Sequence, residues 1–269
     1  MKNEPYSKEF FALQIHFARA VADLTGLPLE RALLDYTNVY VRFELGRAFD
    51  PAHPAWRRYA EGLVRAADVV EWTYRFYLAQ TENSTKPSTR ETFGCFSYEM
   101  QDAERVRLHF RNADPADVSP LSIDRLPLRL GELRSLFEHV KRNHENATGV
   151  VGTSWLYNLR AYRRCFPPEY TASATVAKSK FRNLPLWGQF LDRHGAVREH
   201  IAGDFKRRLS NITGIQDLAY SFPVQALAVD APIAPFFGFY GLTAGCCLRY
   251  ISPQSDKRKP LPIRLRRDP

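Results

Sequence analysis

The strongest constraint on the fold is a change in apolar periodicity across one polar segment. The segment TENSTKPSTRET (81–92) contains Ser, Thr and Pro and almost no apolar residue, which is typical of a linker. Before it, apolar residues recur every three or four positions; after it, they alternate with polar ones. These two periods belong to helices and strands respectively. The sequence therefore predicts a helical region followed by a region built on a sheet.

The first eighty residues carry three helical stripes. The first lies in SKEFFALQIHFARAVADL (7–24), the second in LERALLDYTNVYVRFEL (29–45) and the third in AWRRYAEGLVRAADVVEWTYRFYLAQ (55–80). Each stripe is wide enough to bury one helix face. We therefore expect a three-helix N-terminal domain over residues 1–83, joined by a linker at 84–92 to the remainder.

The segment after the linker mixes strand and helix patterns. FGCFSYEM and ERVRLHFRN alternate around a short turn, QDA, and predict a β-hairpin. Further candidates follow in the order helix, strand, helix, strand, helix, helix and strand, at 128–144, 150–157, 159–166, 169–181, 186–194, 197–209 and 222–230. This mixed order predicts an α/β fold over residues 93–242, with α+β as the alternative.

Charge and apolar content limit the classes of partner. The net charge is +9, but the last 18 residues hold six Lys and Arg against two Asp, and hence +4 of it. Residues 243–269 are therefore expected to form a basic, disordered tail. The charge left on the body makes nucleic acid an unfavoured partner. Neither a secretory signal nor a membrane-spanning run is recognisable, so a cytoplasmic setting without membrane association is expected.

Familiar catalytic and metal motifs do not stand out in this sequence. The four cysteines form no CxxC pair, and the histidines lack the spacing of metal ligands, so no metal is expected. Nucleotide-binding glycine loops and the GxSxG elbow are not found either. Candidate catalytic residues must therefore be sought among side chains that do not form a standard motif.

His109 is the first candidate. It lies in VRLHFRN, where alternation places it on the polar side of a hairpin strand, with Arg111 two residues later. The partner strand offers Tyr98 and Glu99 within cross-strand reach. A histidine beside a carboxylate can act as a general base near neutral pH. The alternative is a solvated strand face.

Ser154 is the second candidate, because it ends the strand VVGTSW. Ligands of open α/β sheets bind at the carboxyl ends of strands. Trp155 and Tyr157 follow and could line such a site, although packing of these aromatic side chains is the alternative.

The order of these elements resembles the GNAT-like acyltransferases that carry a helical N-terminal domain. The resemblance rests on LHFRN at His109, on Ser154-Trp155-Leu156 and on CFPPEY (165–170); Thr153 stands where the family has a histidine. It implies an acyl-CoA donor and a cleft between the hairpin and strand 150–156. His109 or Glu99 would take a proton from an amine, Ser154 would hydrogen-bond the intermediate, and the substrate would contact Tyr98, Arg111, Trp155 and Tyr157.

Three functions follow from these observations. The first is transfer of an acyl group to an amine on a small-molecule substrate. The second is a non-enzymatic scaffold of the same fold that binds a small molecule or a protein. Nucleic-acid binding ranks third, because it requires a basic stripe across the folded body.

Overall fold

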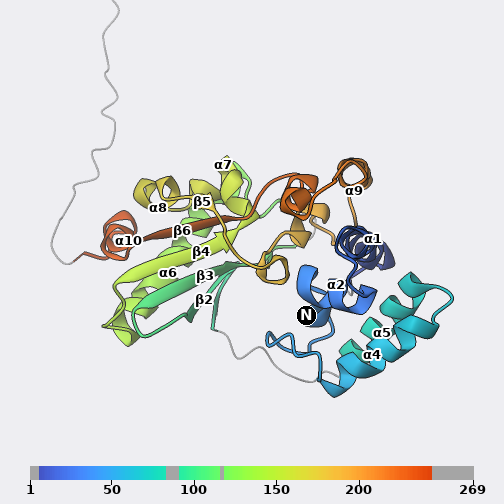
Figure 1. Cartoon of the computed structure of the whole chain (residues 1–269). Helices are drawn as coiled ribbons and strands as arrows, with labels where there is room; N and C mark the ends of the chain where they lie inside the picture. Colours follow the sequence, from blue (N-terminus) through green and yellow to red (C-terminus); the bar gives the residue numbers. More distant parts are fainter. Residues whose placement is uncertain (1–5, 83–90, 116–117, 244–269) are drawn as a thin grey trace, which may run out of the picture.

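A computed structural model describes residues 6–82, 91–115 and 118–243. It consists of a helical region beside a mixed β-sheet that is covered by helices on one face (Figure 1). The predicted α/β fold with N-terminal helices is confirmed. The predicted tail, apart from Thr243, and most of the predicted linker lie outside the described residues.

The first N-terminal helix matches its stripe in length, whereas the second and third stripes are divided into shorter helices. The N-terminal helices are α1 (Lys8–Thr25), α2 (Leu29–Tyr36), α3 (Val39–Arg42), α4 (Pro54–Arg65) and α5 (Val69–Glu82). The second and third expected helices are thus each divided in two. Thr37 separates α2 from α3: its Oγ1 donates to the Leu33 carbonyl oxygen at 2.6 Å and accepts from the Val39 N–H at 3.3 Å. A hydroxyl that competes for backbone groups in this way interrupts a helix.

The break between α4 and α5 has a similar cause. Asp68 Oδ1 accepts from the backbone N–H groups of Val70, at 2.9 Å, and Glu71, at 3.0 Å, and so caps the start of α5. The Trp72 indole N–H then donates to the Tyr59 carbonyl oxygen at 3.0 Å, which fixes α5 against α4. The apolar stripe continues across the break because α4 and α5 both direct their apolar side chains into the same core.

Within the described part of the chain, the sheet contains six strands in the order β1-β2-β3-β4-β6-β5. They are β1 (Thr92–Phe93), β2 (Phe96–Met100), β3 (Arg105–Phe110), β4 (Gly149–Ser154), β5 (Thr175–Val176) and β6 (Leu227–Pro232). Strands β3 and β4 are parallel, whereas the other neighbours are antiparallel. The parallel pair is connected by α6 (Leu126–Asn143), as a crossover requires.

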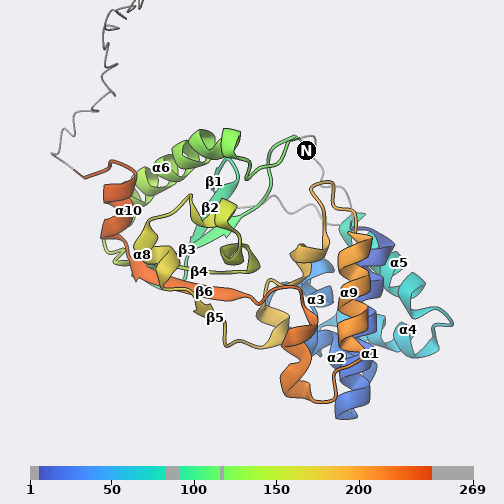
Figure 2. The same cartoon turned by 90° about the horizontal axis from the view of Figure 1, so that it is seen from above.

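One face of the sheet is covered. Helices α6, α7 (Arg160–Arg163), α8 (Pro168–Ala172) and α10 (Ala234–Phe239) pack on the face that carries Val106, Val150 and Val229 (Figure 2). Sequence alternation places Arg107, His109 and Val151 on the opposite face, which we call the open face. Side chains on the open face approach the helical region.

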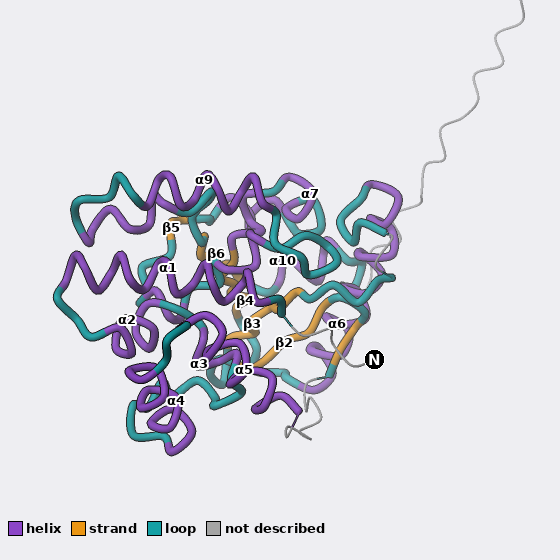
Figure 3. The backbone as a smooth tube through the Cα atoms, turned by 90° about the vertical axis from the view of Figure 1, so that its right-hand side faces the viewer, coloured by secondary structure: helices purple, strands orange, loops and turns teal. Residues whose placement is uncertain are grey.

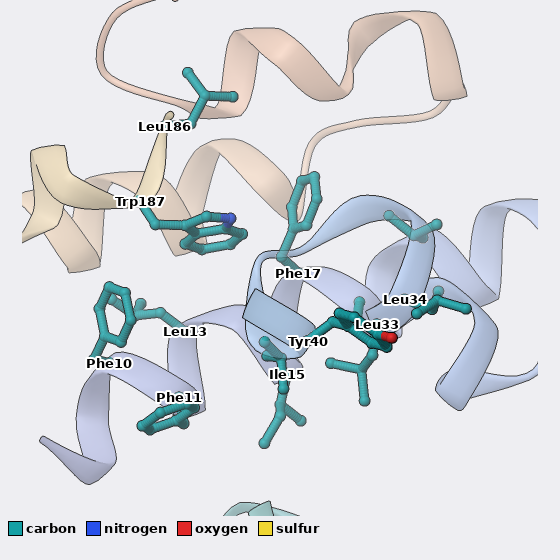
Figure 4. Packing of buried hydrophobic residues seen from close by; sticks show 14 of the residues in the cluster. Phe10, Phe11, Leu13, Ile15, Phe17, Leu33, Leu34, Tyr40, Leu186 and Trp187 are labelled. Atoms are coloured by element: carbon teal, nitrogen blue, oxygen red, sulfur yellow. The ribbon is translucent and has the colours of Figure 1, made fainter. Parts of the chain in front are cut away.

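The core of the helical region also uses residues that follow β5. Helix α9 (Glu199–Leu209) lies beside α1 (Figures 2 and 3). Phe17 of α1 contacts Trp187, Phe205 and Phe222, with ring centroids 5.6, 6.0 and 5.3 Å apart. Figure 4 shows Phe17 and Trp187 within this apolar cluster. The boundary expected at residue 93 thus marks where the sheet begins, while part of the range 93–242 completes the helical core.

The covered face leaves no room for a side chain at Gly152. Tyr157 Oη and Tyr170 Oη, both buried, are hydrogen-bonded at 2.8 Å and lie 2.2 and 2.6 Å from where a Cβ on Gly152 would stand. Gly152→Ala is therefore expected to lower the free energy of unfolding by about 1–3 kcal/mol. Urea unfolding measures this. Gly203→Ala, at an exposed position of α9 with no atom near its Cβ, should leave stability unchanged or raise it by up to about 1 kcal/mol; equal losses in the two variants would contradict the steric cause.

Candidate functional site

The structure brings His109 and Glu99 together on the open face. His109 Nε2 lies 3.2 Å from Glu99 Oε1, and the two side chains are 24% and 31% exposed. In the β2–β3 register, His109 pairs with Ser97 and Glu99 pairs with Arg107, so the two form a diagonal pair on one face. A half-buried imidazole held by a carboxylate has the arrangement of a general base, and Nε2 itself is buried on the side of Glu99.

Two arginines flank the same carboxylate. Arg107 Nε lies 4.0 Å from Glu99 Oε1, and Arg47 Nη1 of the helical region also lies 4.0 Å from it. Among the residues that the structure describes, basic side chains thus bring three nitrogen atoms to one carboxylate oxygen, and that of His109 is the nearest of them. The site is built by both regions of the molecule, because Arg47 is contributed from outside the sheet.

Arg47 lies on a connection between α3 and α4 with unusual backbone geometry. Its neighbours Glu44, Gly46 and Phe49 have φ values of 59°, 91° and 50°. Left-handed backbone is rare for an aromatic residue such as Phe49 and indicates local strain. Phe49 is nevertheless buried, stacking on Tyr40 with ring centroids 5.4 Å apart. Arg47 was not predicted from the sequence, where the glycine directly before it was the available signal.

The parallel strands stop pairing beside His109. The β3–β4 register contains the pairs Arg105–Gly149, Val106–Val150 and Arg107–Val151. Beyond them β3 continues with its β2 partner and β4 continues with β6. We call these continuing segments, Leu108–Phe110 and Gly152–Ser154, the β3–β4 fork. Thr153 alternates with Gly152 and so belongs to the same face as His109, across the fork.

Ser154 is not brought together with His109. It shares the parity of Val150 and therefore belongs to the covered face. Its Oγ accepts from the Leu156 N–H at 3.1 Å and caps the 3₁₀ turn Trp155–Asn158. The hydroxyl thus stabilises the turn after β4, whereas Ser97, the cross-strand partner of His109, and Thr153 bear hydroxyls on the face of His109.

The predicted substrate contacts are also divided between faces. Tyr98 lies on the covered side, where its Oη is hydrogen-bonded to His144 Nε2 at 2.8 Å and burial raises its pKa. Tyr157 is fully buried against Tyr170. Arg111 is exposed at the carboxyl end of β3, and Trp155 is half-buried at the end of β4. Among these four, Arg111 and Trp155 remain accessible near the fork.

A buried ion cluster supports the same end of the sheet. Arg129 of α6, whose side chain is 1% exposed, donates to both oxygens of Asp114 at 2.7 Å and to Glu132 Oε2 at 2.9 Å. Glu132 Oε2 also accepts from the Cys95 N–H at 3.1 Å. Burial raises the pKa of Glu132, and Arg129 opposes that rise. This cluster fastens the β1–β2 turn and the segment after β3 to α6.

Two surface depressions lie away from His109. One, of about 280 Å³, lies against α2 and α4 and includes Leu34 and Trp56 in its lining. The other, of about 470 Å³, lies beside α6 and includes Arg134 and Lys141. Across the described residues, no cluster of three or more metal-ligating side chains is found. Nor does any described helix combine the length and apolar character needed to cross a bilayer.

Comparison with known proteins gave no match to a family model, to a curated protein sequence or to a solved structure. The geometry of the open face is therefore the basis on which a function is proposed.

Proposed function

We propose that the protein is a GNAT-like acyltransferase that moves an acyl group from acyl-CoA to an amine on a small molecule. One observation carries the proposal: the His109–Glu99 pair, at 3.2 Å, lies on an accessible face beside the β3–β4 fork. The layout of a helical region, a hairpin, a crossover helix and a parallel strand agrees with the resemblance in the sequence.

His109 would act as the general base. An amine becomes nucleophilic once it loses its proton, and imidazole is the side chain that most often accepts a proton in general base catalysis. Glu99 would orient the ring and stabilise the imidazolium. The amine nitrogen would form a bond to the thioester carbon, the carbon–sulfur bond would break, and the departing thiolate would take a proton. Thr153, across the fork, would supply the hydroxyl that hydrogen-bonds the intermediate, in place of Ser154.

The residues at the fork fit the extended, amide-bearing arm of coenzyme A. Leu108–Phe110 and Gly152–Ser154 are adjacent strand segments that are not paired with each other. An extended chain that carries amides can add to such strand edges through main-chain hydrogen bonds. Arg111, exposed at the carboxyl end of β3, and Arg160, exposed in α7, are cations suited to the phosphates.

Titration calorimetry with a panel of acyl-CoAs of increasing chain length tests the proposal. At least one member should bind with a Kd between about 1 µM and 1 mM. Replacing Thr153 with Trp, which adds a large side chain on the open face at the fork, should abolish that binding. Replacing exposed Thr175 with Trp at the edge strand is the matched control. If no acyl-CoA binds and no acyl product forms with any amine, the acyltransferase proposal fails.

A non-enzymatic scaffold is the second candidate. Both depressions described above lie away from His109, and the one against α2 and α4 is lined partly by apolar side chains such as Leu34 and Trp56. Binding of a small molecule there, without any acyl transfer, would favour this second function.

A further inference from the structure

We propose that Arg47 and Arg107 bind an oxyanion of the acceptor, a carboxylate or a phosphate, beside His109. The acceptor would then be an amine that also carries an acidic group. This inference rests on the proposed function, because it names the substrate class of the same site.

The first support is the charge balance around Glu99. Arg47 and Arg107 each lie 4.0 Å from Glu99 Oε1, which is within ion-pair range but longer than a hydrogen bond. Arg105, the next basic residue on the open face, is placed between Asp102 at 4.0 Å and Asp230 at 3.4 Å, so its charge is offset. Two guanidinium groups therefore share one carboxylate, which leaves an excess of positive charge at this point.

The second support is the way each arginine is held. Arg107 Nη2 donates to Gln101 Oε1 at 2.6 Å, so one end of its guanidinium is fixed while Nε faces Glu99. Arg47 is 65% exposed. Nearby arginines of the helical region are engaged differently: Arg42 donates to Tyr6 Oη at 2.8 Å, and Arg182 donates to Asp35 at 2.5 Å. Arg47 is thus the arginine of this group that extends toward the sheet.

The third support is the rigid, strained connection that carries Arg47. Positive φ angles at Glu44 and Phe49 cost free energy unless the surroundings hold them. Phe49 is held by stacking on Tyr40 and by the Arg182 guanidinium, 4.9 Å from its ring centroid. Strain of this kind concentrates at binding sites, where it fixes a side chain in place before the ligand arrives. Here it fixes the segment that presents Arg47.

The chemistry of arginine selects the ligand class. A guanidinium presents a planar set of N–H donors that matches the oxygens of a carboxylate or phosphate. Because Arg47 and Arg107 approach the same Glu99 oxygen, their guanidinium groups lie near each other, and one oxyanion beside Glu99 would contact the remaining N–H donors of both. The amine of the same acceptor would then lie near the His109 ring, which is held beside Glu99 by its buried Nε2.

Binding is tested first with inorganic phosphate on the full chain. The histidine side-chain NMR signals are followed at constant ionic strength, and the His109 signal is assigned by its loss in H109Q. Phosphate should shift the His109 signal with saturation, and Arg47→Ala should weaken that binding at least tenfold. Arg58→Ala, an exposed arginine of α4, should bind as the original protein does. An unchanged His109 signal, or equal affinity in Arg47→Ala, would overturn the proposal.

Acceptor preference separates this inference from the proposed function. O-phosphoethanolamine is compared with ethanolamine, and β-alanine with its amide, using release of free coenzyme A thiol. The acidic members should be preferred at least tenfold in kcat/KM, and Arg47→Ala should remove the preference through KM. Comparing the preference within the phosphate pair with that within the carboxylate pair shows which acidic group the site binds. Acyl transfer without such a preference would refute the oxyanion site and keep the acyltransferase. Phosphate binding without any transfer would keep the oxyanion site and refute the acyltransferase.

Discussion

His109→Ala is expected to lower kcat/KM for acyl transfer by about 100- to 10,000-fold, the range that a general base contributes. Binding of the acyl donor should persist, because the fork is formed by backbone segments that the substitution leaves in place. Glu99→Gln should cause a smaller loss, since the ring keeps a polar neighbour of the same size but the imidazolium loses its counter-charge. Steady-state rates and donor calorimetry on the same preparations measure both effects.

The control for this experiment is His200→Ala. His200 is exposed on α9, outside the sheet, and its removal should leave kcat/KM within about twofold of the original value. A His109→Ala protein that transfers acyl groups at the original rate would show that another group accepts the proton. Loss of donor binding in that variant would instead show that His109 acts in binding.

Arg129→Met is expected to produce the largest loss of stability, about 3–5 kcal/mol at neutral pH. Methionine fills much of the arginine volume, so the main effect is electrostatic: the carboxylates of Asp114 and Glu132, 10% and 13% exposed, lose their buried partner. Uncompensated charge in such a place is costly. Urea unfolding followed by circular dichroism measures the loss.

The pH dependence of that loss identifies its cause. Burial already raises the pKa of Glu132 in the folded protein, and removing Arg129 removes an interaction that lowers it. A carboxyl whose folded-state pKa is raised favours the folded state at low pH, and this benefit disappears as pH rises through that pKa. The defect of Arg129→Met should therefore shrink between pH 8 and about pH 4.5.

Arg134→Met provides the matched control for Arg129→Met. Arg134 lies on the same helix in an exposed pair with Glu138 at 3.5 Å, and its replacement should cost about 0.3–0.5 kcal/mol. Equal losses for the two substitutions, or a loss at Arg129 that does not vary with pH, would contradict the buried-charge explanation.

Apolar period predicted which segments become helices and strands, but it did not predict where the helices end. Thr37 and Asp68 each interrupt a continuous apolar stripe because one side chain forms hydrogen bonds with nearby backbone groups: Thr37 donates to a carbonyl oxygen, and Asp68 accepts from N–H groups. The apolar periodicity is a property of many residues together, so it does not reveal the effect of one capping side chain. The expected strand at 169–181 is reduced to Thr175–Val176, because helix α8 takes up its first four residues.

Part of the candidate site was also predictable. Strict alternation along two hairpin strands places Glu99 and His109 on one polar face, whatever the rest of the molecule does. The same rule, applied along β4, separates Ser154 from His109, because Ser154 has the parity of the buried Val150. Position at a strand end drew attention to Ser154, whereas the direction of its side chain depends on which face the helices cover.

The amino-acid sequence by itself thus determined the helical region, the hairpin and the pairing of His109 with Glu99, because each depends on contacts between residues close along the chain. Only the tertiary structure decided that residues after β5 complete the helical core and that Arg47 reaches Glu99. Those contacts join segments far apart in sequence, and their formation depends on how two apolar cores fill their volume. The apolar periodicity of a short segment does not depend on that packing and therefore does not predict it.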